Sequence, residues 1–228
     1  MARLSGLERR ETIVRAARPL FALKGFEPVT TREVAEAAGI SEALLYRHFE
    51  SKAAIYDAVL ESCTQRITNN AKRFEDLPDG TATLVLAIYL IMRSIQSQVL
   101  VDGADRDVSR LVLRSLLSDG AFARKILQFA SKHVVAKIER CVRAAVTAGD
   151  IDEPFDQALT AFWLSHHLAT ALVFYQLPVE PVLEHRPCPN REALFEASVH
   201  YALRGLGFSR ALIKEHYKPK AFARSLEK

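Results

Sequence analysis

Residues 30–52 read TTREVAEAAGISEALLYRHFESK, and this stretch decides the fold of the N-terminal region. Thr30 and Glu33 have the spacing of a capping box, in which a hydroxyl and a carboxylate each bond to a backbone amide at a helix start. Gly39 stands where the chain must reverse, a position that often requires a positive φ. Ser41 has the residue type that caps the next helix. The pattern predicts a helix of about eight residues, a tight turn and a second short helix.

The apolar residues of this stretch give each helix one buried stripe. Leu45 and Phe49 lie four apart on the second helix, and small residues of the first helix allow close approach: Val34, Ala35 and Ala38. Ile40 is placed to fill the angle between the two helices. Together these features are typical of a helix-turn-helix motif.

The other face of the second helix holds short or hydrogen-bonding side chains that suit a DNA major groove. Arg47 has the chemistry to reach guanine or a phosphate, and Ala43 and Leu44 to touch a thymine methyl group. Tyr46 and His48 fit phosphate oxygens better. With flanking residues, the predicted DNA-binding set is Thr31, Arg32, Ser41, Ala43, Leu44, Tyr46, Arg47, His48 and Lys52.

Each of these assignments has a purely structural alternative. Tyr46 and His48 would then pack on a neighbouring helix, and Arg47 would be a solvated charge. Glu42 repels phosphate, so we expect it to cap or to act electrostatically at the helix N-terminus. The basic cluster at the start of the chain forms either a DNA-tracking arm or a disordered start: Arg3, Arg9 and Arg10.

The pattern extends outward on both sides, from ETIVRAARPLFALKGF through TTREVAEAAGIS to LLYRHFESKAAIYDAVL. Over residues 8–60, a quarter of the chain, it resembles the DNA-binding region of the TetR family of bacterial transcriptional regulators. The resemblance implies an all-helical homodimer in which three N-terminal helices bind DNA and a larger C-terminal domain binds a small effector that releases it. It also implies phosphate contacts by Thr31, Tyr46, His48 and Lys52.

The chain departs from the family pattern at two positions. Ala43 stands where the family often has Gly, which narrows the approach to DNA slightly. Pro19 interrupts the first predicted helix, from Glu8 to Leu23, where we expect a kink or a weak point.

The composition excludes several other classes of protein. The 228 residues are 49% apolar and 25% charged, which is typical of globular proteins. The longest wholly apolar run, 84–92, is far shorter than the roughly 20 residues that a membrane span requires. The start of the sequence has no apolar segment of signal-peptide length. Three scattered cysteines suggest neither a disulfide framework nor a zinc site, so we expect a cytoplasmic protein with no metal and no cofactor.

The net charge of +4 is distributed unevenly along the chain. Residues 1–24 and 210–228 each carry six basic and two acidic residues, so the segment between them is acidic. The basic N-terminus permits a polyanionic partner. Beyond a possible short helix at 209–216, we expect the basic C-terminus to be a solvated tail.

The remainder of the chain repeats apolar residues at three- and four-residue spacing, which predicts helices throughout. The sequence therefore predicts an all-α fold of about nine or ten helices. We expect a helix-turn-helix DNA-binding domain at 1–51 and an effector-binding and dimerisation domain at 52–228, with 121–148 as one helical stretch.

Two of the later stretches, 155–176 and 191–206, are apolar nearly all round and need cover on more than one face. Two such helices meeting two from a symmetry mate would form a four-helix interface. The residues predicted at this dimer interface are Ala161, Ser165, Leu168, Ala169, Leu172, Phe195, Ser198, Val199, Ala202, Leu203 and Leu206.

Polar and aromatic side chains amid apolar helices mark a candidate effector pocket. The candidates are Tyr89, Met92, Arg93, Gln96, Arg110, Arg114, Phe129, His133, Phe162, Trp163, His166 and Phe174. For a single aromatic residue the alternative is core packing. For Arg93 and Arg114 it is an internal ion pair.

The function predicted from the sequence is a ligand-responsive repressor that binds a pseudo-palindromic operator as a homodimer and is released by a small hydrophobic or amphipathic effector. One alternative is a regulator controlled by a protein partner, or an activator. The other is a helical enzyme that uses His166, His167 or Cys141. No phosphate loop, nucleophile elbow or metal spacing favours the enzyme, so we expect none.

Overall fold

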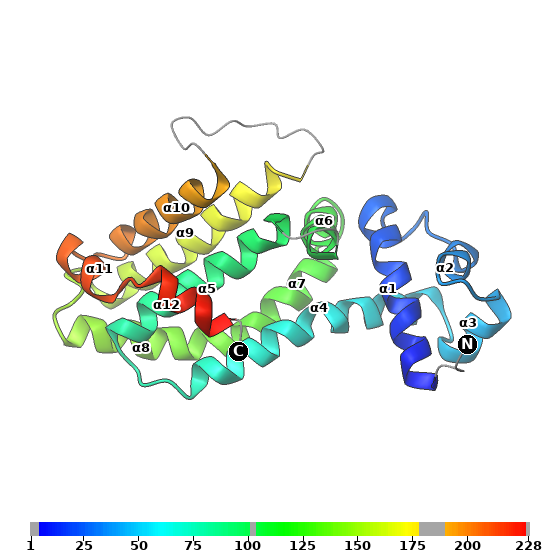
Figure 1. Cartoon of the computed structure of the whole chain (residues 1–228), viewed down its shortest axis with the longest axis horizontal. Coiled ribbons are helices and arrows are strands. Elements are labelled where there is room, and N and C mark those ends of the chain that lie inside the picture. The colour runs from blue at the N-terminus through cyan, green and yellow to red at the C-terminus, as the bar shows by residue number, and fades with distance from the viewer. Residues whose placement is uncertain (1–4, 101–103, 178–189, 227–228) are drawn as a thin grey trace. The chain divides into compact units, whose positions relative to one another are not determined.

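A computed structural model of the chain describes residues 5–100, 104–177 and 190–226. The helices drawn in Figure 1 are α1 (Gly6–Lys24), α2 (Thr31–Ala37), α3 (Glu42–His48), α4 (Lys52–Glu75), α5 (Thr81–Leu100), α6 (Ala104–Leu116), α7 (Ala121–Ala130), the π-helix η1 (Ser131–Val135), α8 (Ala136–Thr147), α9 (Phe155–Phe174), α10 (Arg191–Gly205), α11 (Arg210–His216) and α12 (Pro219–Leu226).

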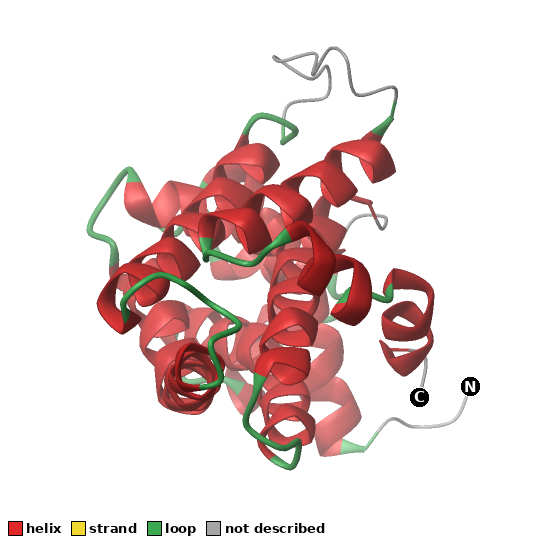
Figure 2. Ribbon diagram, turned by 90° about the vertical axis from the view of Figure 1, so that its left-hand side faces the viewer, coloured by secondary structure: helices red, strands yellow, loops and turns green. Residues whose placement is uncertain are grey.

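The predicted all-α class is confirmed. Figure 2 shows helices joined by loops, and within the described residues the one β-type pairing is an isolated bridge between Ile151 and Phe208. The helix count is higher than expected for two reasons. The predicted stretch 121–148 is interrupted by η1, and the C-terminal segment forms two helices. None of the described helices is both long enough and apolar enough to cross a membrane.

The chain divides into two compact units. Unit 1 comprises Met1–Asn70 and Val101–Ala130, and unit 2 comprises Ala71–Leu100 and Ser131–Lys228. This division falls inside α4, after Asn70, and not after residue 51. The predicted boundary at residue 51, which separates DNA binding from effector binding, therefore stays a proposal about function.

The first helix begins earlier than the sequence suggested. Ser5 and Glu8 form a capping box, in which the Ser5 hydroxyl accepts from the Glu8 amide and the Glu8 carboxylate accepts from the Ser5 amide at 2.7 Å. The helix then continues through Pro19 to Lys24 and ends at Gly25, whose φ of 89° suits glycine.

The core of unit 1 joins the first four helices to α6 and α7. Phe21 of α1 is fully buried, and its ring centroid lies 5.1 Å from that of Tyr56 on α4 in an edge-to-face arrangement. Arg114 of α6 donates to the backbone oxygens of Ala22 and Leu23. These are the last carbonyls of α1, which lack partners within the helix, so Arg114 fastens α6 to the end of α1.

Unit 2 is built around α5, which packs against α8, α9, α10, α11 and α12. The apolar side chains of α5 explain this central position, because Leu84, Ile88 and Met92 are all buried. The buried Lys137 of α8 pairs with Asp79 at 2.8 Å and donates to the Glu75 and Leu77 carbonyls, which secures the turn between α4 and α5.

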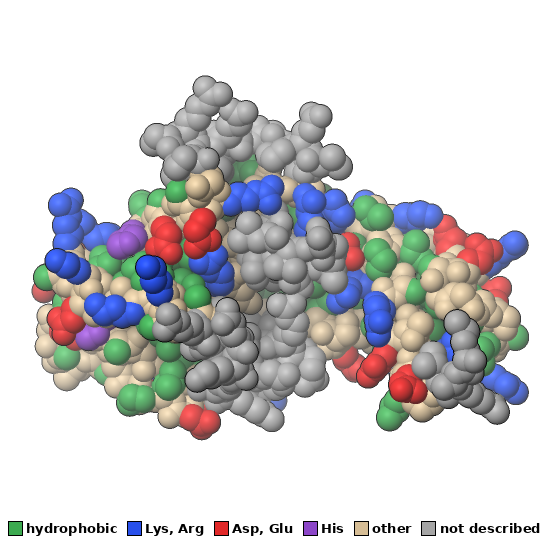
Figure 3. All heavy atoms as spheres, in the orientation of Figure 1, with side chains coloured by type: hydrophobic (Ala, Val, Ile, Leu, Met, Phe, Trp, Pro, Cys, Tyr) green, Lys and Arg blue, Asp and Glu red, His purple; other side chains and the backbone are tan. Residues whose placement is uncertain are grey.

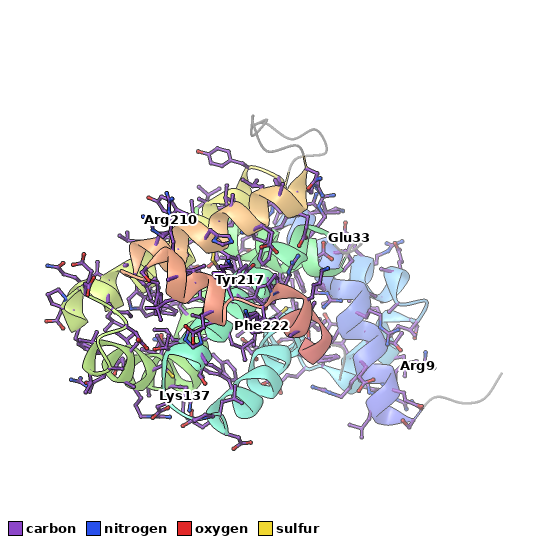
Figure 4. All side chains as sticks on the ribbon, turned by 60° about the vertical axis from the view of Figure 1, so that its left-hand side comes forward. Arg9, Glu33, Lys137, Arg210, Tyr217 and Phe222 are labelled. Atoms are coloured by element: carbon purple, nitrogen blue, oxygen red, sulfur yellow. The ribbon has the colours of Figure 1, made fainter. Side chains whose placement is uncertain are left out.

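The C-terminal segment is not the solvated tail that the sequence suggested. Ser209 caps α11, and Ile213 and Tyr217 are buried. The ring of Tyr217, at the end of α11, packs edge to face with that of Phe222 on α12, with centroids 6.0 Å apart (Figure 4). Both rings also pack on Tyr89 of α5, at 6.0 Å and 5.3 Å. These apolar contacts between residues distant in sequence hold the segment in place.

Candidate DNA-binding site

The helix-turn-helix forms as its local signals predicted. The Thr30 hydroxyl accepts from the Glu33 amide at 3.2 Å, and the Glu33 carboxylate accepts from the Thr30 amide at 2.8 Å. Gly39 has a φ of 66° in the turn, and the Ser41 hydroxyl accepts from the Leu44 amide at 3.2 Å. Thr30 and Glu33 fix the start of α2, Gly39 allows the turn that follows it, and Ser41 fixes the start of α3. The start of α3 in turn determines which of its residues point outward.

The two faces of α3 differ as the sequence suggested. Leu45 and the following Phe49 are buried in the core of unit 1. Tyr46 and Arg47 are exposed, as is Ala43, whereas Leu44 and His48 are half-buried. The exposed side of α3 therefore presents one small, one aromatic and one cationic side chain, a set with the chemistry to contact bases and phosphates.

An open depression of about 380 Å³ lies at the C-terminal end of α3. Its lining includes the predicted DNA-contacting residues Tyr46, Arg47 and His48, together with Arg10 of α1 and Glu50. Three predicted residues thus share one concave surface.

Arg10 holds a position that sequence reasoning did not identify. Its guanidinium lies 4.0 Å from the centroid of the Phe49 ring and donates to the His48 carbonyl oxygen. A cation at the C-terminus of a helix interacts favourably with the carbonyls that lack partners there. Arg10 thereby joins α1 to the end of α3. The sequence signal was only a basic residue near the N-terminus, without its distant partner.

Hydrogen bonds also link α2 to the start of α3. The Thr31 hydroxyl donates to the Glu42 carboxylate at 2.5 Å, and the oxygens of Thr31 and Tyr46 lie 3.2 Å apart. Two predicted phosphate-contacting hydroxyls are therefore brought together, and both connect to a carboxylate. Sequence reasoning gave Glu42 only a role at the helix terminus.

The flanking basic residues already have partners within the chain. Arg32 pairs with Glu36 at 3.1 Å, but both side chains are largely exposed, so the pair contributes little stability. Lys52 donates to the carbonyls of Phe26 and Glu27 at 3.0 and 3.1 Å. An ammonium group has three donors, so Lys52 has one donor beyond the two that secure the loop before α2.

The surface over α1–α3 has no patch of a single charge on the face drawn in Figure 3, where basic and acidic side chains are interspersed. Among the acidic residues, Glu33 is held ionised by its neighbours. A hydrogen bond from Lys24 and the contacts with Thr30 lower its pKa to about 2. Any DNA affinity therefore depends on where individual side chains point.

The effector-pocket candidates of α5 take several roles in unit 2. Tyr89 and Met92 are buried in the core. Arg93 forms a two-pronged ion pair with Glu192, at 2.6 and 2.8 Å, and lies 3.6 Å from the centroid of the Phe195 ring. Arg93 therefore has the internal ion pair given as its alternative. The amide nitrogen of the buried Gln96 has no partner among the described residues and lines a space of about 10 Å³, room for one water molecule.

The candidates of α9 also lie in unit 2. Phe162 is buried, and its ring packs edge to face with that of Trp163, 5.6 Å away between centroids. The Nδ1 atom of His166 is buried without a hydrogen-bond partner in the described structure, and burial lowers the pKa of this side chain. Phe174 is half-buried near the end of the helix.

The other four pocket candidates are placed elsewhere. Arg110 and Arg114 on α6 and Phe129 on α7 belong to unit 1. Arg114 makes two hydrogen bonds to the end of α1, which give it a structural role within unit 1, and its role in an effector pocket stays a prediction. The His133 side chain lies outside the described residues.

The predicted dimer residues require a correction. Ala161 and Leu168 are half-buried, but the single chain already buries the other nine: Ser165, Ala169, Leu172, Phe195, Ser198, Val199, Ala202, Leu203 and Leu206. Six of them share one hydrophobic core with the buried residues of α5: Ala169, Phe195, Val199, Ala202, Leu203 and Leu206. The exposed side of α9 and α10 consists of other residues, among them Leu164 and Tyr201, which are 63% and 71% exposed.

Comparison with known proteins places the helix-turn-helix in a family. Residues 13–59 match the family described as "Bacterial regulatory proteins, tetR family". The chain is also 33% identical over 94 residues to the nucleoid occlusion factor SlmA of Vibrio campbellii, which is 40% of this chain and 48% of that protein. The chain thus spans about half the length of the curated SlmA relatives that it matches.

Solved structures resemble the chain over most of its length. AmtR of Mycobacterium smegmatis has a TM-score of 0.63 at 21% identity, covering 100% of this chain and 98% of its own. AibR, solved with isovaleryl coenzyme A and operator DNA, has a TM-score of 0.61 at 17% identity, covering 85% and 97%. At these identities the likeness concerns the fold. Residues 13–59 thus match the tetR family of bacterial regulatory proteins, and the chain as a whole shares its fold with these solved structures.

Proposed function

We propose that the chain is a homodimeric, ligand-responsive transcriptional repressor that binds a pseudo-palindromic operator through α3. The observation that carries this proposal is the outward face of α3, where Tyr46 and Arg47 are exposed while Leu45 of the same helix is fully buried. A helix held so firmly by one face can present the other to a major groove without losing its core.

The second part of the proposal is dimerisation through the exposed side of α9 and α10. On α9, the exposed Leu164 and the half-buried Leu168 lie four residues apart. Tyr175, which directly follows α9, is 49% exposed, and Tyr201 on α10 is 71% exposed. Large apolar side chains exposed on two adjacent helices favour an isologous contact with a second copy. Such a dimer would carry two α3 helices, which explains why we propose an operator with two half-sites.

The third part is release from DNA by a small hydrophobic or amphipathic molecule bound in unit 2. AibR was solved with a coenzyme A thioester and operator DNA, and the same fold in this chain supports a comparable arrangement. Within unit 2, the unpartnered Gln96 amide and His166 Nδ1 are the buried polar atoms that a ligand could satisfy.

The alternative is a DNA-binding protein controlled by a macromolecular partner. The likeness to a nucleoid occlusion factor favours it, because that name describes no small effector. The two functions differ in what relieves DNA binding.

The test is a footprint on DNA upstream of the protein's own gene, followed by a screen of small acyl and aromatic compounds for loss of binding. Two protected half-sites centred one or more helical turns apart would support the dimeric repressor. An effector must also bind less tightly when DNA is present, because linkage is reciprocal. Protection of a single half-site would contradict the dimer proposal.

A further inference from the structure

We infer that Glu42 competes with DNA phosphates, by occupying the two hydroxyl groups that the proposed function assigns to the DNA backbone. The inference rests on that proposed function, since it assumes that Thr31 and Tyr46 contact phosphate. It adds a role for a residue that the predicted DNA-binding set omits.

The argument begins with the direction of the hydrogen bonds. The Thr31 hydroxyl donates to a Glu42 carboxylate oxygen at 2.5 Å, so the Thr31 proton points to Glu42. The Tyr46 hydroxyl lies 3.2 Å from the Thr31 oxygen and must then be the donor in that pair. Both hydroxyl protons are thus directed along a chain from Tyr46 to Thr31 to Glu42.

A DNA phosphate would need the same protons. A phosphate oxygen, like a carboxylate, is an anionic acceptor of charge-assisted hydrogen bonds. While both hydrogen bonds are formed, the Thr31 proton is donated to Glu42 and the Tyr46 proton to Thr31. A phosphate that takes the Thr31 proton must therefore displace the Glu42 carboxylate from this hydrogen bond, and the Tyr46 proton must leave Thr31 to reach the phosphate.

The exposure of the three residues makes this exchange feasible. Glu42 is exposed at the first residue of α3, Tyr46 is 49% exposed and Thr31 is half-buried. The Glu42 side chain can therefore turn into solvent without unfolding α3. Wherever it turns, its negative charge stays close to the DNA, which adds a repulsive component to the competition.

Glu50 provides a matched control for that repulsion. It is an exposed carboxylate at the other end of α3, and it lines the depression shared by Tyr46 and Arg47. Glu50→Ala removes the same charge from the same surface but leaves the chain of hydroxyls intact. The difference between Glu42→Ala and Glu50→Ala therefore isolates the competition.

The experiment measures the Kd of the full-length protein for a fluorescent 30-base-pair duplex of mixed sequence at several salt concentrations. A mixed sequence removes any contribution from base reading by Glu42. We expect Glu42→Ala to tighten binding about tenfold and Glu50→Ala about twofold, since a charge-assisted hydrogen bond is replaced only in the first. Circular dichroism of each variant checks that α3 remains folded.

Repeating the comparison in a protein without the two hydroxyl groups tests whether the effect of Glu42 acts through them. In a Thr31→Val, Tyr46→Phe protein the hydroxyl protons are absent, so Glu42→Ala should gain no more than Glu50→Ala does. The inference would be overturned if Glu42→Ala weakened DNA binding, or if Glu42→Ala and Glu50→Ala raised the affinity equally. It would also be overturned if Glu42→Ala raised the affinity as much in the Thr31→Val, Tyr46→Phe protein as in wild type. Failure of the proposed operator recognition would instead appear as equal wild-type affinity for upstream and mixed-sequence DNA.

Discussion

The Tyr217 hydroxyl donates to the Glu196 carboxylate at 2.7 Å, which ties the end of α11 to α10. The same tyrosine ring packs on Tyr89 of α5, so one residue of the C-terminal segment contacts two central helices of unit 2. Burial and the neighbouring carboxylate raise the pKa of Tyr217, so it stays protonated and keeps donating at physiological pH.

The first prediction separates the two roles of Tyr217. Tyr217→Phe removes only the hydrogen bond and should lower the free energy of unfolding by about 1 kcal/mol. Tyr217→Ala also removes the buried ring and should cost about 3–5 kcal/mol. Urea denaturation of both variants measures this, with Lys220→Ala as the exposed control from α12. Equal, negligible losses would mean that the segment is not anchored.

The second prediction tests which side of α3 faces the core. Leu45 is fully buried, so Leu45→Ala should reduce the free energy of unfolding by about 2–5 kcal/mol. Its neighbour Leu44 is half-buried on the side that we propose faces DNA, so Leu44→Ala should weaken DNA binding with a smaller loss of stability. Thermal unfolding and DNA affinity of both variants provide the comparison. A larger loss of stability for Leu44→Ala than for Leu45→Ala would show that α3 turns the Leu44 side, and not the Leu45 side, toward the core.

These two regions show what sequence could predict and what it could not. The helix-turn-helix was predictable because its signals are local: Thr30 and Glu33 are three residues apart, and Gly39 marks the turn. A short helix at 209–216 was predicted as possible, but α12 and the anchoring of the segment were missed, because the partners of Tyr217, namely Tyr89 and Glu196, are distant in sequence. No local pattern identifies such partners.

The dimer residues illustrate a second limit. A helix that is apolar nearly all round, such as α9, gives no periodic signal of which side the chain itself covers. Ala169 is fully buried and Leu164 is 63% exposed, although both are residue types suited to either side. The polar neighbours of α3 removed this ambiguity for Leu45, which explains why that helix was oriented correctly.

The third prediction concerns the proposed dimer. Leu164→Glu would place a charge, repeated by symmetry, in the apolar contact, and we expect it to give monomers at micromolar concentration. Sedimentation velocity measures the change. Leu117→Glu is the matched control, because Leu117 is 81% exposed and belongs to unit 1. A dimer that survives Leu164→Glu but not Leu117→Glu would place the interface elsewhere.

The fourth prediction concerns pH. Because the pKa of Glu33 is lowered from 4.5 to about 2, its ionised form stabilises the fold above about pH 4.5, and this contribution is lost as the pH falls toward 2. Wild type should therefore have a higher Tm than Glu33→Gln at pH 6, and the difference should shrink between pH 4.5 and 2. Glu11→Gln, at an exposed carboxylate of α1, is the control. A Tm difference independent of pH would contradict the assignment.

The central claim is that α3 recognises DNA, and one measurement tests it most directly. Fluorescence anisotropy with DNA from upstream of the gene compares wild type with a Tyr46→Ala, Arg47→Ala protein, and Arg210→Ala serves as a charge-matched control on α11. Loss of base or phosphate contacts by Arg47 alone should cost about 1–3 kcal/mol, so we expect the double variant to bind at least tenfold more weakly. The control should bind like wild type. Unchanged affinity of the folded double variant would contradict the assignment of α3 as the recognition helix.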